Sequence, residues 1–224
     1  MSKEKLIIRT SQEYITLMDS KKYELTKETI IVDSSILYRI KALIDIPSKD
    51  IKKGDLGGFI ENESNLSHEG SCWVADNAKV SGSARVSGNA KVYDNAWVYD
   101  NARVYGSARV FGNAWVFDYA RVYDNAKVYG NALVYDNALV SGSARVSGSA
   151  RVSGNALVYD NAIVYGNANV ADNALVYDTA RIYDTARIYD NAWVYGSARV
   201  YGSARVYGSA KIDKFTLTDD EFLC

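Results

Sequence analysis

The fold is decided by residues 71–100, which read SCWVADNAKVSGSARVSGNAKVYDNAWVYD and repeat every six positions. The aliphatic position of this repeat starts at Val74 and recurs without an insertion to Ile212, which gives 24 hexads. Ala stands two residues before each aliphatic from Ala78 to Ala210, and Cys72 takes that place in the first hexad. The unit reads Asn/Ser–Ala–x–Val–Tyr–Asp/Gly, and a fixed period of this kind predicts a repeat architecture.

Within each hexad the apolar positions alternate as they do in a β-strand. Ala and Val are two residues apart and face the same side, whereas the x residue and the Tyr position face the other side. The Asp-Asn, Gly-Ser and Gly-Asn pairs at the hexad borders form turns. Strands this short bury their apolar side only by stacking on identical neighbours. With three hexads in each coil, the sequence predicts an all-β parallel solenoid of eight triangular coils with an Ala/Val interior.

The pattern resembles the left-handed β-helix hexapeptide-repeat family, in which an aliphatic residue is followed four positions later by a small one. Val74 with Ala78 fits this rule, and so do nearly all later hexads. The left-handed winding is implied by the resemblance, because parallel crossovers are otherwise right-handed. The run KGDLGGFIE at residues 53–61 also resembles the lead-in of uncharacterised hexapeptide-repeat proteins from bacterial genomes and prophages, some of which are labelled acyltransferases. A phage or prophage origin is implied in the same way.

Three segments follow from where the repeat starts and stops. Residues 1–70 are predicted to form an N-terminal β-rich cap, with apolar runs near Thr29–Asp33 and Ile36–Ile46 that favour a hairpin or meander. Residues 71–212 form the β-helix, and residues 213–224 form a C-terminal cap in which Thr218–Glu221 resembles a helix start. Caps are expected because the open end of a solenoid exposes unpaired strand edges.

Composition and charge limit the partners that we expect. The chain has 26 basic and 27 acidic residues, and this balance argues against bulk attraction to nucleic acid or to an anionic membrane. No apolar run reaches the length of a membrane-spanning helix, and the N-terminus lacks a signal-peptide core. Two cysteines do not make a disulfide framework. We therefore expect a cytoplasmic protein with reduced thiols.

Catalysis is not favoured by the residues of the repeat. Enzymes of the left-handed β-helix family use a His near a subunit cleft and often a loop outside the coils, whereas this repeat has no His and no insertion. His68, just before the first coil, is expected to be a surface or capping residue. Cys72 is expected to be buried, Cys224 has no His partner, and the recurrent corner Asp residues are expected to form turns. We predict a non-catalytic structural or interaction scaffold without metal or cofactor, with an acyltransferase-like enzyme as the alternative.

The outward x positions supply candidate interaction surfaces. Residues 18 apart stack on one face, and one face begins with Arg85, Arg103 and Arg121 and continues with four large apolar side chains. Nothing in the coil is expected to cover these four, and a contiguous apolar patch usually marks an interface. We predict a homo-oligomer packed along this face, with a tryptophan pair as a second contact. The interface candidates are Leu139, Leu157, Leu175 and Trp193 with Tyr159 and Tyr177, and then Trp97 and Trp115.

The outward Arg and Tyr ladders give a third alternative, a module that binds a nucleotide or a glycan. Arg pairs with phosphate or carboxylate, and aromatic rings stack on bases or sugars. The x positions carry 14 basic residues against 11 Asp residues at the corners, and this near balance argues against a nucleic-acid partner. The ligand candidates are Arg181, Arg187, Arg199, Arg205, Tyr183, Tyr189 and Tyr201.

Overall fold

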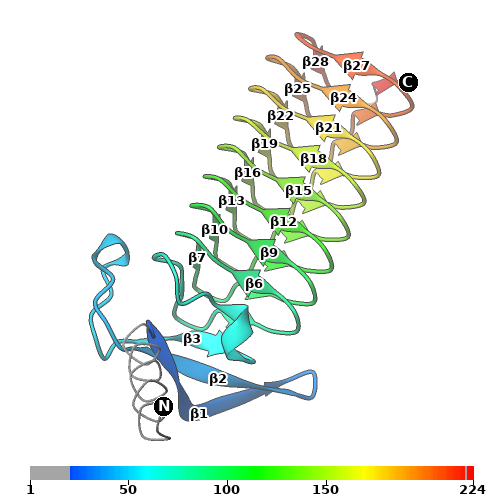
Figure 1. The fold of residues 1–224 in the computed structure, drawn as a ribbon. Coiled ribbons are helices and arrows are strands. Elements are labelled where there is room, and N and C mark those ends of the chain that lie inside the picture. The colour runs from blue at the N-terminus through cyan, green and yellow to red at the C-terminus, as the bar shows by residue number, and fades with distance from the viewer. Residues whose placement is uncertain (1–20, 220) are drawn as a thin grey trace, which may run out of the picture.

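The computed structural model describes residues 21–219 and 221–224, and it has the triangular solenoid architecture that the repeat predicts (Figure 1). Each hexad contributes one two-residue strand, from β4 (Trp73–Val74) to β27 (Lys211–Ile212). The strands form three parallel sheets that wind through about nine turns. The prediction of an all-β solenoid is confirmed, while its left-handed winding stays a prediction.

Each sheet collects every third strand of the chain. The eight-stranded sheet contains β6 (Arg85–Val86), β9 (Arg103–Val104), β12 (Arg121–Val122), β15 (Leu139–Val140), β18 (Leu157–Val158), β21 (Leu175–Val176), β24 (Trp193–Val194) and β27. The nine-stranded sheet contains β4, β7 (Lys91–Val92), β10 (Arg109–Val110), β13 (Lys127–Val128), β16 (Arg145–Val146), β19 (Ile163–Val164), β22 (Arg181–Ile182), β25 (Arg199–Val200) and β28 (Thr216–Leu217). The twelve-stranded sheet contains β1 (Tyr23–Val32), β2 (Ser35–Ala42), β3 (Leu56–Ile60), β5 (Lys79–Val80), β8 (Trp97–Val98), β11 (Trp115–Val116), β14 (Leu133–Val134), β17 (Arg151–Val152), β20 (Asn169–Val170), β23 (Arg187–Ile188), β26 (Arg205–Val206) and β29 (Phe222–Leu223).

The expected stacking of residues 18 positions apart is confirmed throughout the repeat. Arg85 pairs with Arg103, for example, and its N–H donates to the Ala102 carbonyl at 2.9 Å. The Ala and aliphatic positions line the interior and are almost all fully buried, and Cys72 is buried in the first Ala position. Identical apolar side chains therefore pack on one another along the tube.

The corners are held by Asp or Gly in the left-handed region of φ, which these two residue types tolerate better than most. Asp136 has φ 56°, and its Oδ2 accepts a hydrogen bond from the Gly154 N–H of the next coil at 3.0 Å. The same bond recurs along the corners, as between Asp94 and Gly112. The interpretation of the corner Asp residues as turn formers is confirmed.

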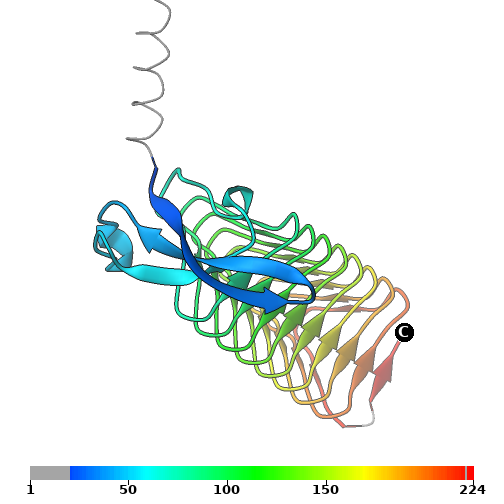
Figure 2. The same ribbon diagram turned by 90° about the horizontal axis from the view of Figure 1, so that it is seen from below.

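The N-terminal cap is antiparallel and continuous with the tube. Strands β1 and β2 form a hairpin, and β3 pairs antiparallel with β2 and parallel with β5. The hairpin lies across the N-terminal end of the solenoid in both views (Figures 1 and 2). Two 3-10 turns, η1 (Pro47–Lys49) and η2 (Glu63–Asn65), flank β3. The expected hairpin or meander is therefore confirmed.

The tube extends beyond the 24 hexads at both ends, and this explains why it has about nine turns rather than the eight predicted. At the N-terminal end β3 and a bridge from Leu66 to Val86 precede the first full coil. At the other end β28 pairs with β25, and β29 pairs with β26.

The helix start expected at Thr218–Glu221 is wrong. The Thr218 N–H does donate to the Glu221 side chain, and this bond is half of a helix capping box. Phe222 and Leu223 nevertheless pair with β26, because that edge strand offers unpaired backbone groups. No described helix of the chain is long and apolar enough to cross a membrane.

Candidate functional site

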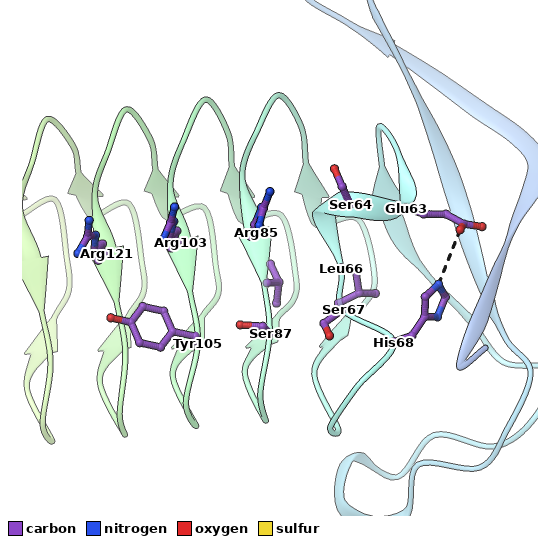
Figure 3. Close-up of a pocket in the computed structure, with 11 residues that line it drawn as sticks. Glu63, Ser64, Leu66, Ser67, His68, Arg85, Ser87, Arg103, Tyr105 and Arg121 are labelled. Atoms are coloured by element: carbon purple, nitrogen blue, oxygen red, sulfur yellow. Dashed lines mark ion pairs between the residues drawn. The ribbon is translucent and has the colours of Figure 1, made fainter. Parts of the chain in front are cut away.

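A groove of about 580 Å³ lies where the eight-stranded sheet meets η2, at the N-terminal end of the tube. Its floor is a row of arginines, one from each of three successive coils, and a Ser and a Tyr form a second row beside it (Figure 3). The η2 turn and the chain that follows it form the end wall. The main polar lining residues are Ser64, Ser67, Arg85, Arg103, Tyr105 and Arg121.

The end wall is fixed by η2 and its cap. The Asn62 side chain accepts a hydrogen bond from the Ser64 N–H at 3.0 Å, and Asn65 Oδ1 accepts one from the Asn62 N–H at 2.9 Å. Asn65 is fully buried and donates from Nδ2 to the carbonyls of Gly82 and Ala84 at 3.0 and 2.9 Å. The wall is thereby tied to the first complete coil.

The three arginines of the floor are exposed and stand in direct register on β6, β9 and β12. Adjacent strands are about 4.8 Å apart, and like charges directly opposite each other destabilise a sheet. Across the described part of the chain, no carboxylate lies within ion-pair distance of Arg85, Arg103 or Arg121. The floor is therefore a short column of guanidinium groups without an ion-pair partner among the described residues.

The second row contains a gap in an aromatic ladder. Tyr105 stacks on Tyr123 with ring centroids 5.0 Å apart and an interplanar angle of 1°. The next position towards η2 is Ser87, whose N–H donates to the Val104 carbonyl at 3.0 Å. Because Ser87 has no ring, the face of Tyr105 on that side borders the groove (Figure 3).

His68 lines the end of the groove and is held in place by contacts with the cap. Its Nδ1 accepts a hydrogen bond from the Lys22 N–H at 3.1 Å, and its ring stacks on Tyr23 at 4.3 Å. Nε2 lies 3.9 Å from a carboxylate oxygen of Glu63, and burial lowers the pKa of His68 although Glu63 opposes this effect. A neutral His that accepts at Nδ1 carries its proton on Nε2. No ring lone pair is then free for general-base catalysis, in agreement with the capping role.

The predicted apolar interface lies on β15, β18, β21 and β24 of the same sheet, beyond the arginines. The expectation that nothing in the coil covers these side chains is wrong, because Leu139, Leu157, Leu175 and Trp193 are each half-buried. Neighbouring rings stack in a column beside them: Tyr159 lies 4.9 Å from Tyr177, which lies 5.1 Å from Tyr195. Lys211 Nζ lies 4.1 Å from the centre of the Trp193 ring.

This column of rings is also interrupted by a serine. Ser141 lies between Tyr123 and Tyr159, and a shallow hollow of about 230 Å³ opens there. Leu139 and Leu157 complete its lining.

The second apolar candidate lies on the twelve-stranded sheet. Trp97 is half-buried against Tyr99, with ring centroids 4.5 Å apart, and its Nε1 donates to Ser81 Oγ at 3.1 Å. Trp115 packs edge-on against Trp97 at 5.6 Å and is 41% exposed. Trp115 is therefore the more accessible member of this pair.

The predicted ligand residues near the C-terminal end do not converge on one site. Arg181 and Arg199 pair on the nine-stranded sheet, where Tyr183 stacks on Tyr201 at 5.0 Å. Arg187 and Arg205 pair on the twelve-stranded sheet beside Tyr189, with a hollow of about 260 Å³. These candidates therefore form two separate faces, as the 18-residue stacking predicts.

The groove is not predicted by the sequence. The repeat assigns its arginines only to the start of one outward face, and it gives Ser87 no role. The signal was present in the sequence, because Ser replaces the ring at the Tyr position of a hexad whose x residue is Arg. The wall could not be anticipated, since it depends on contacts across the cap.

The fold and these ladders define a β-solenoid repeat protein, and a family comparison agrees. The family model described as YdcK Beta solenoid repeat matches residues 84–100, 98–110, 120–135, 132–148, 150–166, 180–196 and 186–202. These stretches of the chain are thus similar to the YdcK β-solenoid repeat, and the arginine strands β6, β9 and β12 all lie within them. No curated protein matches the chain.

Proposed function

We propose that the protein is a non-catalytic interaction scaffold, a rigid solenoid that associates with a second copy of itself through its eight-stranded sheet. The observation that carries the proposal is the register of Leu139, Leu157, Leu175 and Trp193 on four consecutive strands. Parallel strands hold these side chains in one line, so the partner meets a preformed surface and little conformational entropy is lost on binding.

The hollow at Ser141 gives this surface a specific feature. A side chain from the second copy that enters the hollow would contact Tyr123 and Tyr159 on its two sides. Aromatic anchors in pockets contribute much of the binding free energy at protein interfaces. Partial burial of the leucines also fits a surface that is stable before association.

The experiment compares two arginine substitutions by light scattering of the full chain. Leu157→Arg places a charge in the middle of the apolar line and is expected to reduce the mass to that of one chain, 24.7 kDa. Ile163→Arg is the matched control, because Ile163 is also a half-buried x residue and lies on β19 of another sheet. An unchanged mass for Leu157→Arg would refute self-association through this face.

Acyl transfer is the alternative that the geometry supports less well. It would need His68 to accept a proton, and the Lys22 N–H already occupies the Nδ1 lone pair.

We also propose a cytoplasmic location, supported by free thiols at both Cys72 and Cys224. The phage or prophage origin stays a prediction.

A further inference from the structure

We propose that the groove between η2 and the arginine column binds a nucleotide, with its base on the open face of Tyr105 and its phosphates on the arginines. This site lies at the N-terminal end of the sheet that carries the proposed self-association face, and it does not depend on that association. The groove volume of about 580 Å³ falls within the range of about 300–1,000 Å³ that is usual for small-molecule sites.

The arginine column defines the anionic part of the ligand. Arg85, Arg103 and Arg121 project from neighbouring strands in register, and guanidinium groups bind phosphate oxygens through paired hydrogen bonds. Three positive charges along a line suit an anion with several charges along a chain better than a single small anion. A chain of phosphates would also offset the repulsion between the arginines.

The gap at Ser87 defines the planar part of the ligand. Along the described aromatic ladders, rings one coil apart stack at 4.7 to 5.3 Å, as Tyr105 does on Tyr123. A ring bound above Ser87 would continue this ladder on the other face of Tyr105. Base stacking on an aromatic side chain is sequence-tolerant and contributes substantially to nucleotide affinity.

The two parts of the site lie at a suitable separation. Arg85 and Ser87 are two residues apart on one extended segment, which separates the two rows by about 6–7 Å. A base in the Ser87 gap would therefore have its sugar and phosphates directed along the neighbouring arginine row. The Ser67 hydroxyl lines the end of the groove and can donate to the ligand, whereas the Ser64 hydroxyl already donates to Asn62 Oδ1.

Glu63 is the carboxylate that lines the groove and would oppose an anion. Its two carboxylate oxygens accept hydrogen bonds from Lys21 Nζ at 2.7 and 3.0 Å. The close-up shows this carboxylate on the His68 side of η2, away from the arginine row (Figure 3). Its charge is therefore compensated within the wall.

The test is isothermal titration calorimetry of the full chain with ATP, inorganic tripolyphosphate and adenosine. ATP is expected to bind. Tripolyphosphate lacks the base and should bind about 10-fold more weakly than ATP, which is the effect of one stacking contact. Ser87→Tyr fills the gap with the consensus ring of the repeat and should weaken ATP about 10-fold or more for the same reason. Arg103→Gln removes the central charge and should weaken ATP and tripolyphosphate alike.

Ser147→Tyr is the matched control, because it makes the same change at the Tyr position of β16 on another sheet. It is expected to leave ATP affinity unchanged. Leu157→Arg is also expected to retain ATP affinity, so failure of self-association and failure of this site are distinguishable. The proposal is overturned if ATP does not bind, if Ser87→Tyr binds ATP like the wild type, or if tripolyphosphate binds as tightly as ATP.

Discussion

Replacing Asp136 separates the two physical roles that the structure gives to a corner residue. Asp136 adopts φ 56°, and its carboxylate accepts the Gly154 N–H of the next coil at 3.0 Å. Ala loses both the tolerance for this φ and the hydrogen bond. Gly keeps the tolerance and loses the bond, whereas Asn keeps both.

The expected free-energy changes follow from these roles. One hydrogen bond contributes about 1 kcal/mol net, and the left-handed conformation costs Ala about 1–2 kcal/mol. Asp136→Ala should therefore destabilise the local coil by about 2–3 kcal/mol. Asp136→Gly should cost about 1.5 kcal/mol, because the unfolded chain also gains freedom. Asp136→Asn should cost less than about 0.5 kcal/mol, since both roles survive.

Native-state hydrogen exchange of the Gly154 amide is the appropriate assay, because a solenoid opens locally and a global unfolding curve averages over its coils. The protection factor is expected to fall in the order Asn, Gly, Ala. Equal protection in the Ala and Asn variants would refute the account of the corners, and so would a Gly variant less protected than the Ala variant.

Three further predictions concern the interior, the cap and one ring column. Val140→Ala should lower the free energy of local opening, measured by native-state hydrogen exchange, by about 2 kcal/mol, because two buried methyl equivalents are lost and a cavity remains. The half-buried neighbour Leu139→Ala should cost less, and a reversed order would contradict the packing. Because burial lowers the pKa of His68, its contribution to cap stability is complete above the unfolded value of about 6.5 and is lost as the pH falls through the folded pKa. Exchange of the Lys22 amide, corrected for the intrinsic rate, should accelerate on acidification, and His68→Asn should abolish this dependence; an equal dependence in the variant would exclude His68 as its source. Burial, reinforced by Asp100 and Asp118, raises the pKa of Tyr99 to about 12, and burial raises the pKa of Tyr23 further. Ultraviolet titration should therefore show late-ionising tyrosines, and Tyr99→Phe should lower the amplitude of the step near pH 12 by one tyrosine; an unchanged amplitude would assign that step elsewhere.

The repeat allowed most of the tube to be predicted from the sequence. A strict period of six places Ala and Val inside, and the 18-residue stacking assigns each x residue to a face. The sequence therefore predicts correctly that the x residues from Arg85 to Trp193 at 18-residue intervals share one face. These features are local, or they follow from translation of one unit along an axis, so no tertiary knowledge is needed.

The sequence does not predict the strands at the two ends of the tube, because their spacing departs from the regular 18-residue coil. Ile60 pairs with Val80 and Leu66 with Val86, both 20 residues apart, so the first partial coil lies outside the hexad register. Leu217 pairs with Val200 at a separation of 17 residues, so the 18-residue spacing of the repeat does not predict the last strands. A pattern search at a fixed period does not detect such changes in coil length.

The sequence also overestimates the exposure of Leu139, Leu157, Leu175 and Trp193, for a different reason. The periodicity shows that Leu157 points outward, but it does not show where the ring of Tyr159 lies. Both side chains project from the same face two residues apart, and Leu157 is half-buried beside the column in which Tyr159 stacks on Tyr177. The groove at Ser87 likewise depends on long-range contacts, such as that between Lys22 and His68, which are 46 residues apart.

Sedimentation velocity of the unmodified full chain over a range of concentrations tests the proposed scaffold role most directly. Self-association along Leu139, Leu157, Leu175 and Trp193 predicts a species heavier than one chain whose population grows with concentration. A single species of 24.7 kDa at every concentration would contradict it.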